Sequence, residues 1–251
     1  MEVKRERLPL LDALRGLTIL SMIVYHGMYD LVELYGLHVG WFWKAPGYVW
    51  QQSICWIFIL LSGFCWSLGS RPLRRGLLVS ACGLVVTAVT CVFMPSELII
   101  FGILTFTGAA MLALIPLSKL LEKVPAGVGL AASAVLFFLS RNVNAGYWGF
   151  EQLMLGRVPE GLYRNLFTTF LGFQAPDFYS GDYFSFIPWI FLYLCGYFLY
   201  ELLGSRERVL HVLRLRGGFL ETIGKHSLLI YMLHQIVLMA VFTVAAWMGI
   251  L

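Results

Sequence analysis

The chain has 251 residues, of which 59% are hydrophobic, 16% aromatic and only 13% charged. An average soluble domain carries about 25% charged and roughly 45–50% apolar residues, so this composition is typical of a polytopic membrane protein. The net charge of +4 does not indicate a nucleic-acid partner, because the basic residues fall in loops between apolar segments. The length leaves room for one helical bundle. We therefore expect a single transmembrane domain over residues 1–251.

Seven apolar segments approach the roughly 20 residues that a helix needs to cross the hydrocarbon core of a bilayer. The predicted spans cover residues 10–32, 50–69, 76–94, 98–117, 126–141, 185–203 and 226–249. They are too long and too continuously apolar for barrel strands, which predicts an all-α, multi-pass helical bundle. The first segment keeps an arginine and lacks a small-residue cleavage site, so we expect it to remain as a helix.

The basic residues predict an orientation with the N-terminus inside and the C-terminus outside. Inside segments then hold thirteen lysines and arginines, and outside segments hold four. The thirteen are Lys4, Arg5, Arg7, Arg71, Arg74, Arg75, Lys119, Lys123, Arg206, Arg208, Arg214, Arg216 and Lys225; the four are Lys44, Arg141, Arg157 and Arg164. The longest outside loop covers about 142–184. Its aromatic, amphipathic stretch from Leu162 to Phe173 predicts a surface-lying or re-entrant helix.

Polar residues inside the first span indicate a functional site. Arg15 and His26, with ten residues between them, are preceded by Asp12 and followed by Asp30. Each charge in a span costs about 2.5–3.5 kcal/mol on insertion scales, so a span that retains charges is a candidate site. Each acid is three or four positions from its neighbour and can pair with it on one helical face. An Asp–His pair would orient the imidazole and raise its basicity. The alternatives are an interfacial Asp12–Arg15 salt bridge and an Asp30 that only marks the helix end.

Further polar residues are predicted on the outer side, where an extracytoplasmic substrate would arrive. His38 lies in the loop after the first span, Gln51 and Gln52 open the second, and Asp182 and Trp189 mark the entry to the sixth. Each also has an ordinary structural interpretation. His38 can be an exposed loop histidine, the glutamines can be polar residues at a helix start, and Asp182 can be a helix cap.

The last span carries a second polar face. Ser227, Tyr231 and His234 stand at positions i, i+4 and i+7, with His234 near the predicted midplane and Gln235 beside it. A buried neutral histidine bonded to a neighbouring helix is the alternative. The cysteines show neither zinc-site nor disulfide spacing and are expected to be small buried hydrophobes, at positions Cys55, Cys65, Cys82, Cys91 and Cys195.

Three separate blocks of sequence together resemble a known group of proteins. The Arg15-to-His26 spacing and the Ser227–Tyr231–His234 helix are similar to motifs of membrane acyltransferase family three. A narrower resemblance, to bacterial relatives of heparan-alpha-glucosaminide N-acetyltransferase, rests on the segments Met22–Leu31, Phe101-Gly-Ile-Leu and Asp182–Trp189. The resemblance covers nearly the whole chain.

The resemblance implies an acyl-CoA-dependent N- or O-acetyltransferase in a bacterial plasma membrane, in contact with membrane lipids. The donor would be cytoplasmic acetyl-CoA, the acceptor an extracytoplasmic sugar or glycan, and no metal is implied. A homodimer is plausible by analogy with the human relative. Expected catalytic residues are His26, Asp30 and His38; expected donor-binding residues are Arg15, Asp12, Arg74, Arg75, His234 and Tyr231; expected acceptor-binding residues are Gln51, Gln52, Asp182 and Trp189.

The sequence departs from this family at one informative place. The human lysosomal member has an asparagine where this chain has His26, and its catalytic histidine falls near Leu37, one position short of His38. The general base is therefore His26 or His38. Two other functions stay open on the residues alone: a small transporter whose intramembrane Arg, Asp and His form an ion or substrate path, and an inactive scaffold or sensor.

Overall fold

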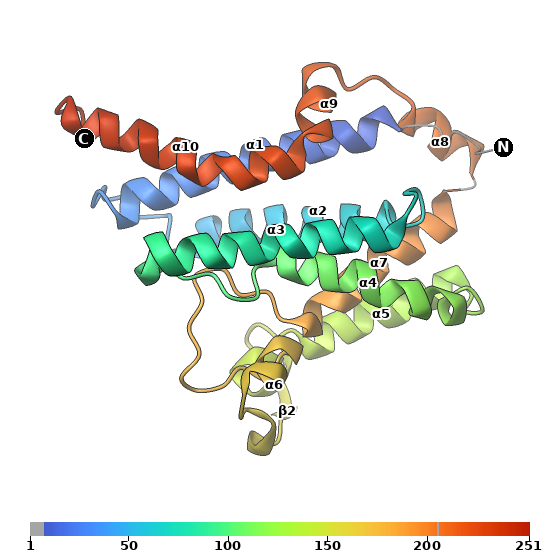
Figure 1. Ribbon diagram of the computed structural model, residues 1–251. Helices are drawn as coiled ribbons and strands as arrows, with labels where there is room; N and C mark the ends of the chain where they lie inside the picture. The colour runs from blue at the N-terminus through green and yellow to red at the C-terminus, as the bar shows by residue number, and fades with distance from the viewer. Residues whose placement is uncertain (1–7, 205) are drawn as a thin grey trace. The chain divides into compact units, whose positions relative to one another are not determined.

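The computed structural model describes residues 8–204 and 206–251, and most of them are helical. Figure 1 shows the helices in chain order. They are α1 (Pro9–Glu33), α2 (Ala45–Phe64), α3 (Pro72–Phe93), α4 (Ile103–Leu121), α5 (Ala126–Ser140), α6 (Leu166–Leu171), α7 (Phe186–Leu203), α8 (Glu207–Leu213), α9 (Gly218–Lys225) and α10 (Ser227–Trp247). Three short 3₁₀ turns occupy Pro95–Glu97, Val143–Ala145 and Glu160–Leu162, and the strands β1 (Tyr147–Phe150) and β2 (Leu153–Arg157) form one hairpin.

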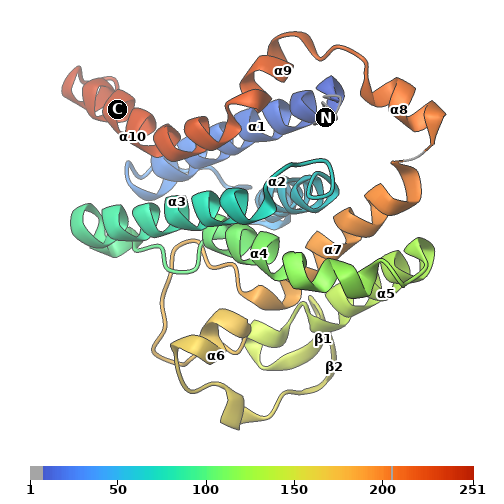
Figure 2. The same cartoon turned by 45° about the vertical axis from the view of Figure 1, so that its right-hand side comes forward.

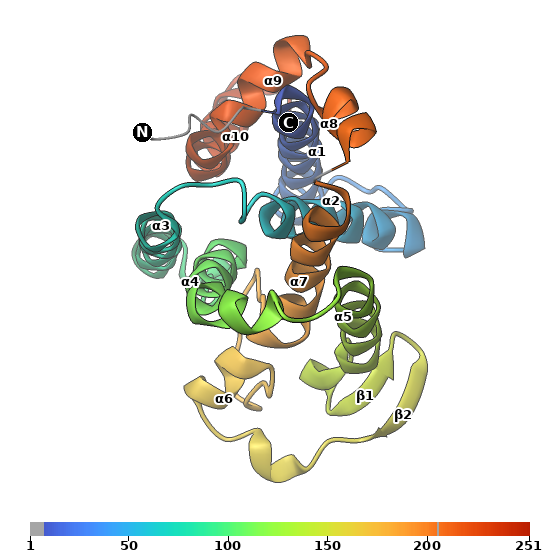
Figure 3. The same ribbon diagram turned by 90° about the vertical axis from the view of Figure 1, so that its right-hand side faces the viewer.

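The helices divide into two compact units. Unit 1 comprises the described residues of 1–61 and 205–251, and unit 2 comprises 62–204. In unit 1, α1 lies against α9 and α10, as the successive views show (Figures 1 and 3). In unit 2, α3 packs on α4 and α5 packs on α7, and the hairpin and α6 lie at one end of these helices (Figure 2).

Five helices of the described chain are long and apolar enough to cross a membrane, so the protein is an integral membrane protein. They are Pro72–Phe93, Ile103–Leu121, Ala126–Ala145, Phe186–Leu203 and Ser227–Trp247. The first two predicted spans are also helical but are not among the five. Four charged residues in α1 and two glutamines in α2 account for their lower hydropathy. The count of seven and the orientation of the termini stay predictions.

Two helices differ most from the predicted spans. The second helix begins at Ala45 and ends at Phe64 rather than covering 50–69, in keeping with Pro46, which suits a first helical turn. The fourth begins at Ile103 rather than at residue 98, because Phe101 adopts a left-handed backbone conformation with φ 56° that no helix can include. Residues 98–101 instead bond to the segment 180–184 through Gly181 N–H to Leu98 O (2.9 Å) and Phe184 N–H to Phe101 O (2.8 Å).

The long connection between α5 and α7 contains the one clear departure from an all-α fold among the described residues. Strands β1 and β2 pair antiparallel around a tight turn in which Glu151 has φ 50°. The Asn142 side chain donates to the Glu151 carbonyl at 2.8 Å and holds the turn. The helix predicted over Leu162–Phe173 is shorter, because Asn165 caps its start and Gly172, at φ 131°, ends it.

In unit 1, α1 and α9 approach so closely that their main chains touch. A Cβ on Gly16 would overlap the Leu220 carbonyl, and a Cβ on Gly224 would overlap the Asp12 carbonyl. Small residues allow such backbone contact between membrane helices, where lipid supplies no hydrophobic drive for association. This crossing fixes α9 against the first half of α1.

We expect Gly224→Ala to destabilise the protein by about 1–3 kcal/mol, because the new methyl group must push two helix backbones apart. The measurement is the thermal unfolding midpoint of the purified protein in detergent. The matched control is Gly127→Ala, a helical glycine in α5 whose Cβ would meet nothing within 4 Å. Equal midpoints for the two variants would contradict the close crossing.

Candidate active site

Helices α1 and α10 bring polar side chains together within unit 1. The imidazole rings of His26 and His234 lie 5.0 Å apart between centroids, at an interplanar angle of 58°. Asp30 lies one turn beyond His26 on α1, and both of its carboxylate oxygens accept from the amide of Gln235, the residue that follows His234, at 2.9 Å. Asp30 is buried, with 2% of its surface exposed. The pairing of Asp30 with Gln235 therefore ties the two helices beside the histidine pair.

The hydrogen bonding of His234 fixes which of its nitrogens is basic. Its Nδ1 lies 2.6 Å from the main-chain carbonyl of Tyr231, an oxygen that only accepts, so Nδ1 carries the proton. In the neutral ring Nε2 is then an acceptor. Nε2 is buried and has no hydrogen-bond partner among the described residues. His234 thus holds a basic nitrogen beside His26.

Apolar residues support this polar group from one side. Ile19, Met22 and Tyr25 of α1 pack with Phe42 and Ile54 into a buried cluster. Partly buried residues of α9 and α10 extend it: Ile223, Ile230 and Tyr231. The Tyr25 ring meets the Trp50 ring edge-on at 5.2 Å, and the Trp50 indole donates to Ser21 at 2.9 Å. The cluster anchors the face of α1 next to His26 and limits the freedom of that helix.

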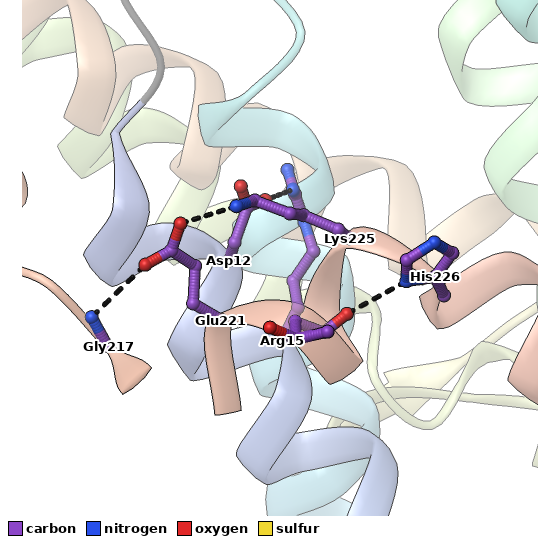
Figure 4. Close-up of polar contacts among 7 residues, drawn as sticks. Asp12, Arg15, Gly217, Glu221, Lys225 and His226 are labelled. Atoms are coloured by element: carbon purple, nitrogen blue, oxygen red, sulfur yellow. Dashed lines mark hydrogen bonds and ion pairs between the residues drawn. The ribbon is translucent and has the colours of Figure 1, made fainter. Parts of the chain in front are cut away.

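A second polar group lies at the other end of α1 (Figure 4). On α1, Arg15 Nη1 donates to Asp12 at 2.8 Å; on the neighbouring α9, Lys225 Nζ donates to Glu221 at 2.5 Å. The hydrogen bond from Lys225 lowers the pKa of Glu221, to which Gly217 N–H also donates. Eleven helical steps of about 1.5 Å place Arg15 roughly 16 Å from His26 along α1. The two groups are therefore separate sites on one helix.

The other predicted site residues of unit 1 lie in the loop between α1 and α2 and on α2 itself. His38 is exposed in the loop between α1 and α2. Gln51 is exposed, and Gln52 accepts a hydrogen bond from Trp56 at 3.2 Å. Catalysis by His38 and acceptor binding by the two glutamines stay predictions.

The other predicted site residues belong to unit 2. Arg74 is exposed on α3, while Arg75 is partly buried. Trp189 is 4% exposed, and the Arg141 guanidinium lies 4.9 Å from its ring centroid. This stacking is a cation–π contact that helps hold the start of α7. Roles of these residues in donor or acceptor binding stay predictions.

Asp182 occupies the start of α4. Its Oδ2 accepts from the Ile103 N–H at 3.5 Å, so it caps a helix of another part of the chain. Ser180 adds two bonds to Ile100, one from the Ile100 N–H at 3.0 Å and one to the Ile100 carbonyl at 2.8 Å. Burial raises the pKa of Asp182 to about 6, and the Ile103 hydrogen bond only partly offsets this.

Some polar residues of these groups were outside the predicted site. No local pattern marks the contact of Gln235, whose partner is 205 positions away in sequence, whereas Glu221 and Lys225 pair at i, i+4, a spacing that the sequence itself displays. The one sequence feature that could indicate Gln235 is its amide in an apolar span, because a buried amide requires a hydrogen-bond partner. No group of three or more metal-ligating side chains occurs within residues 8–204 and 206–251.

We expect the pH dependence of stability to report Asp182. Its pKa is higher in the folded protein than the ordinary 3.8, so the folded state binds more protons between about pH 4 and pH 6. Stability contributed by the protonated acid is present below about pH 4 and is lost as the pH rises through 6. Relative to Asp182→Asn, wild type should lose about 1–3 kcal/mol between pH 4 and pH 7. Thermal midpoints across this range measure it, with the exposed Asp177→Asn as control. Parallel curves for wild type and Asp182→Asn would contradict the assignment.

We expect Gln235→Ala to lower the free energy of unfolding by about 1–3 kcal/mol, because the buried Asp30 carboxylate loses two amide hydrogen bonds. The double variant Asp30→Ala/Gln235→Ala should lose less than the sum of the two single changes. Denaturation in detergent measures these values, with the exposed Gln51→Ala as control. Additive losses would show that the Asp30–Gln235 contact is not a coupled pair.

A family described as heparan-alpha-glucosaminide N-acetyltransferase, catalytic, matches residues 7–236, which include both polar groups of α1, the histidine pair and Gln235. A search of curated proteins found no match, and a search of solved structures found none.

Proposed function

Because this chain belongs to the heparan-alpha-glucosaminide N-acetyltransferase catalytic family, a family of membrane acetyltransferases, we propose that it moves an acetyl group across a bacterial plasma membrane. The donor is cytoplasmic acetyl-CoA, and the acceptor is the amine or hydroxyl of an extracytoplasmic sugar or glycan. The observation that carries the proposal is the pair of imidazoles, His26 and His234, with the buried Asp30–Gln235 contact beside them.

In the proposed reaction the acceptor heteroatom attacks the carbonyl carbon of the thioester. His26 removes the proton from that heteroatom as the new C–N or C–O bond forms. The tetrahedral intermediate then breaks its C–S bond, and the thiolate of coenzyme A leaves and takes up the proton that His26 received. His234 is the nearest basic group to His26, and its unpaired Nε2 can accept a hydrogen bond from His26 or from the acceptor.

The second polar group of α1 suits the donor. Arg15 and Lys225 are cations at the end of the α1–α9 pair, and guanidinium and ammonium groups bind phosphate by charge-assisted hydrogen bonds. Asp12 and Glu221 hold these cations in position. The pantetheine arm of acetyl-CoA is long and thin, so its phosphates and its thioester can lie at two sites about 16 Å apart on α1.

His26 is the preferred general base over His38. His26 is partly buried and faces a second imidazole, whereas His38 lies exposed in a loop. A base shielded from bulk water keeps its proton transfer directed at the acceptor and protects the thioester from hydrolysis. His38 stays the alternative that the experiment must test.

We expect His26→Ala to lower acetyl transfer by about 10²–10⁴-fold without preventing acetyl-CoA binding, because the general base alone is removed. Arg15→Ala should instead weaken donor binding. Acetyl transfer is measured in proteoliposomes with radiolabelled acetyl-CoA and with glucosamine as a first acceptor. Acetyl-CoA binding is measured by isothermal titration in detergent. The matched control is His211→Ala, an exposed histidine of α8.

Other outcomes would change the assignment. Full activity in His26→Ala together with loss in His38→Ala would make His38 the base. Absence of acetyl-CoA binding and of thioester cleavage in folded wild-type protein would refute the acyltransferase proposal and favour transport.

A further inference from the structure

Residues 206–225, which we call the basic segment, present a surface that the proposed acyl transfer uses only at its end, through Glu221 and Lys225. The segment comprises α8, the turn 214–217 and α9, and α10 begins two residues after Lys225, at Ser227. Helix α10 is long and apolar enough to cross a membrane. A segment joined so directly to the first residue of that helix lies at the membrane boundary, where a bilayer surface can meet it.

One side of the basic segment is fixed on α1. Both α8 and α9 contact that helix, and Figure 3 shows them beside it. A Cβ on Gly217 would overlap the Ala13 side chain, and a Cβ on Gly224 would overlap the Asp12 carbonyl, so the turn and α9 lie directly on the first half of α1. The other side of the segment is left for a partner.

That exposed side is positively charged. Five basic and two acidic residues occur in 206–225, a formal net charge of +3. Glu221 pairs with Lys225, and Glu207 lies 3.9 Å from Arg214 in an exposed contact of a kind that contributes little to stability. The guanidinium of Arg214 can therefore exchange this contact for another anion. The exposed arginines are Arg206, Arg208, Arg214 and Arg216.

Apolar side chains are exposed among these arginines. Val212 is 48% exposed, Leu215 52% and Phe219 76%, and Leu215 stands between two of the arginines in the chain. A water-soluble anion would bind the guanidinium groups but would leave the apolar side chains in water. A phospholipid surface offers phosphate to the first and acyl chains to the second, which is how interfacial segments of mixed basic and apolar composition bind membranes.

We propose that the basic segment binds anionic phospholipids at the membrane surface. The guanidinium groups of its four arginines bind the lipid phosphates by charge-assisted hydrogen bonds, while Val212, Leu215 and Phe219 lie at the level of the upper acyl chains. Because the opposite side of the segment packs on α1, a bound lipid also holds α9 against that helix.

Native mass spectrometry of the full chain in detergent tests the proposal, by titration with phosphatidylglycerol and separately with phosphatidylcholine of the same acyl chains. Wild type should bind the anionic lipid roughly 10–100-fold more tightly. In Arg214→Gln/Arg216→Gln this preference should fall by about fivefold for each arginine removed. The matched control is Lys119→Gln/Lys123→Gln, which removes two exposed positive charges from unit 2 and should keep the preference.

A second variant tests the apolar part of the surface. Phe219→Ser should weaken binding of both lipids by roughly tenfold, because a phenyl group that leaves water on binding is lost while every charge stays. Phe93→Ser is the control, since Phe93 at the end of α3 is also 76% exposed and lies outside the segment. Folding of each variant is checked by its thermal midpoint in detergent.

Three outcomes would overturn the proposal. They are equal affinity of wild type for the two lipids, the same preference in Arg214→Gln/Arg216→Gln as in its control, and binding of glycerol phosphate as tight as that of phosphatidylglycerol. The last would assign the arginines to a soluble phosphate instead of a membrane surface. Because no acetyl-CoA is present in these titrations, the lipid surface can stand or fail independently of the proposed acetyl transfer.

Discussion

Close contact between helix backbones at glycines is the constraint on which both units depend. In lipid, apolar side chains gain little by leaving one apolar environment for another, so helices associate through close packing and hydrogen bonds. Glycine provides that approach between α1 and α9 at Gly16 and Gly224, and between α2 and α7 at Gly63. In unit 2, Gly83 and Gly108 do the same between α3 and α4, where an added Cβ would overlap Thr105 or Ser80. The polar groups described above all lie beside helices held in this way.

The packing of α10 on α1 explains how polar side chains persist in an apolar chain. The Asp30 carboxylate is buried and receives both of its Gln235 hydrogen bonds only because α10 lies against α1. The hydrogen bonds from Gln235 offset part of the desolvation cost that an unpaired carboxylate in a membrane span would have. The histidines next to this pair are thereby set at a short, constant separation. A site built on helices in this way is positioned more accurately than one built on loops.

Most of the helices could be located from the sequence, since five predicted apolar segments correspond to α1, α3, α5, α7 and α10. The hairpin was not predicted, because strands of four and five residues carry no usable periodicity and their turn depends on Glu151 at positive φ. The displaced start of α4 has a similar origin: Phe101 is apolar enough for a helix but is held out of one by bonds to the segment 180–184. The residues His26, Asp30, Tyr231 and His234 could be named in advance from their unusual polarity in apolar segments. Which of them meet, and that Gln235 is the partner of Asp30, follows from the docking of α10 on α1, which no local pattern records.

The crossing at Gly16 and Gly224 also limits which amino-acid substitutions the protein can accept during evolution. The atoms that an added side chain would strike are main-chain carbonyls of Leu220 and Asp12, not side chains that a second substitution could shorten. Both positions already carry the smallest residue, so neither can shrink to accommodate growth at the other. A large residue at one site therefore has no compensating partner, and the only remaining route is a shift of a whole helix that carries Arg15 or Lys225 with it. The packing of the two helices therefore requires glycine at both positions.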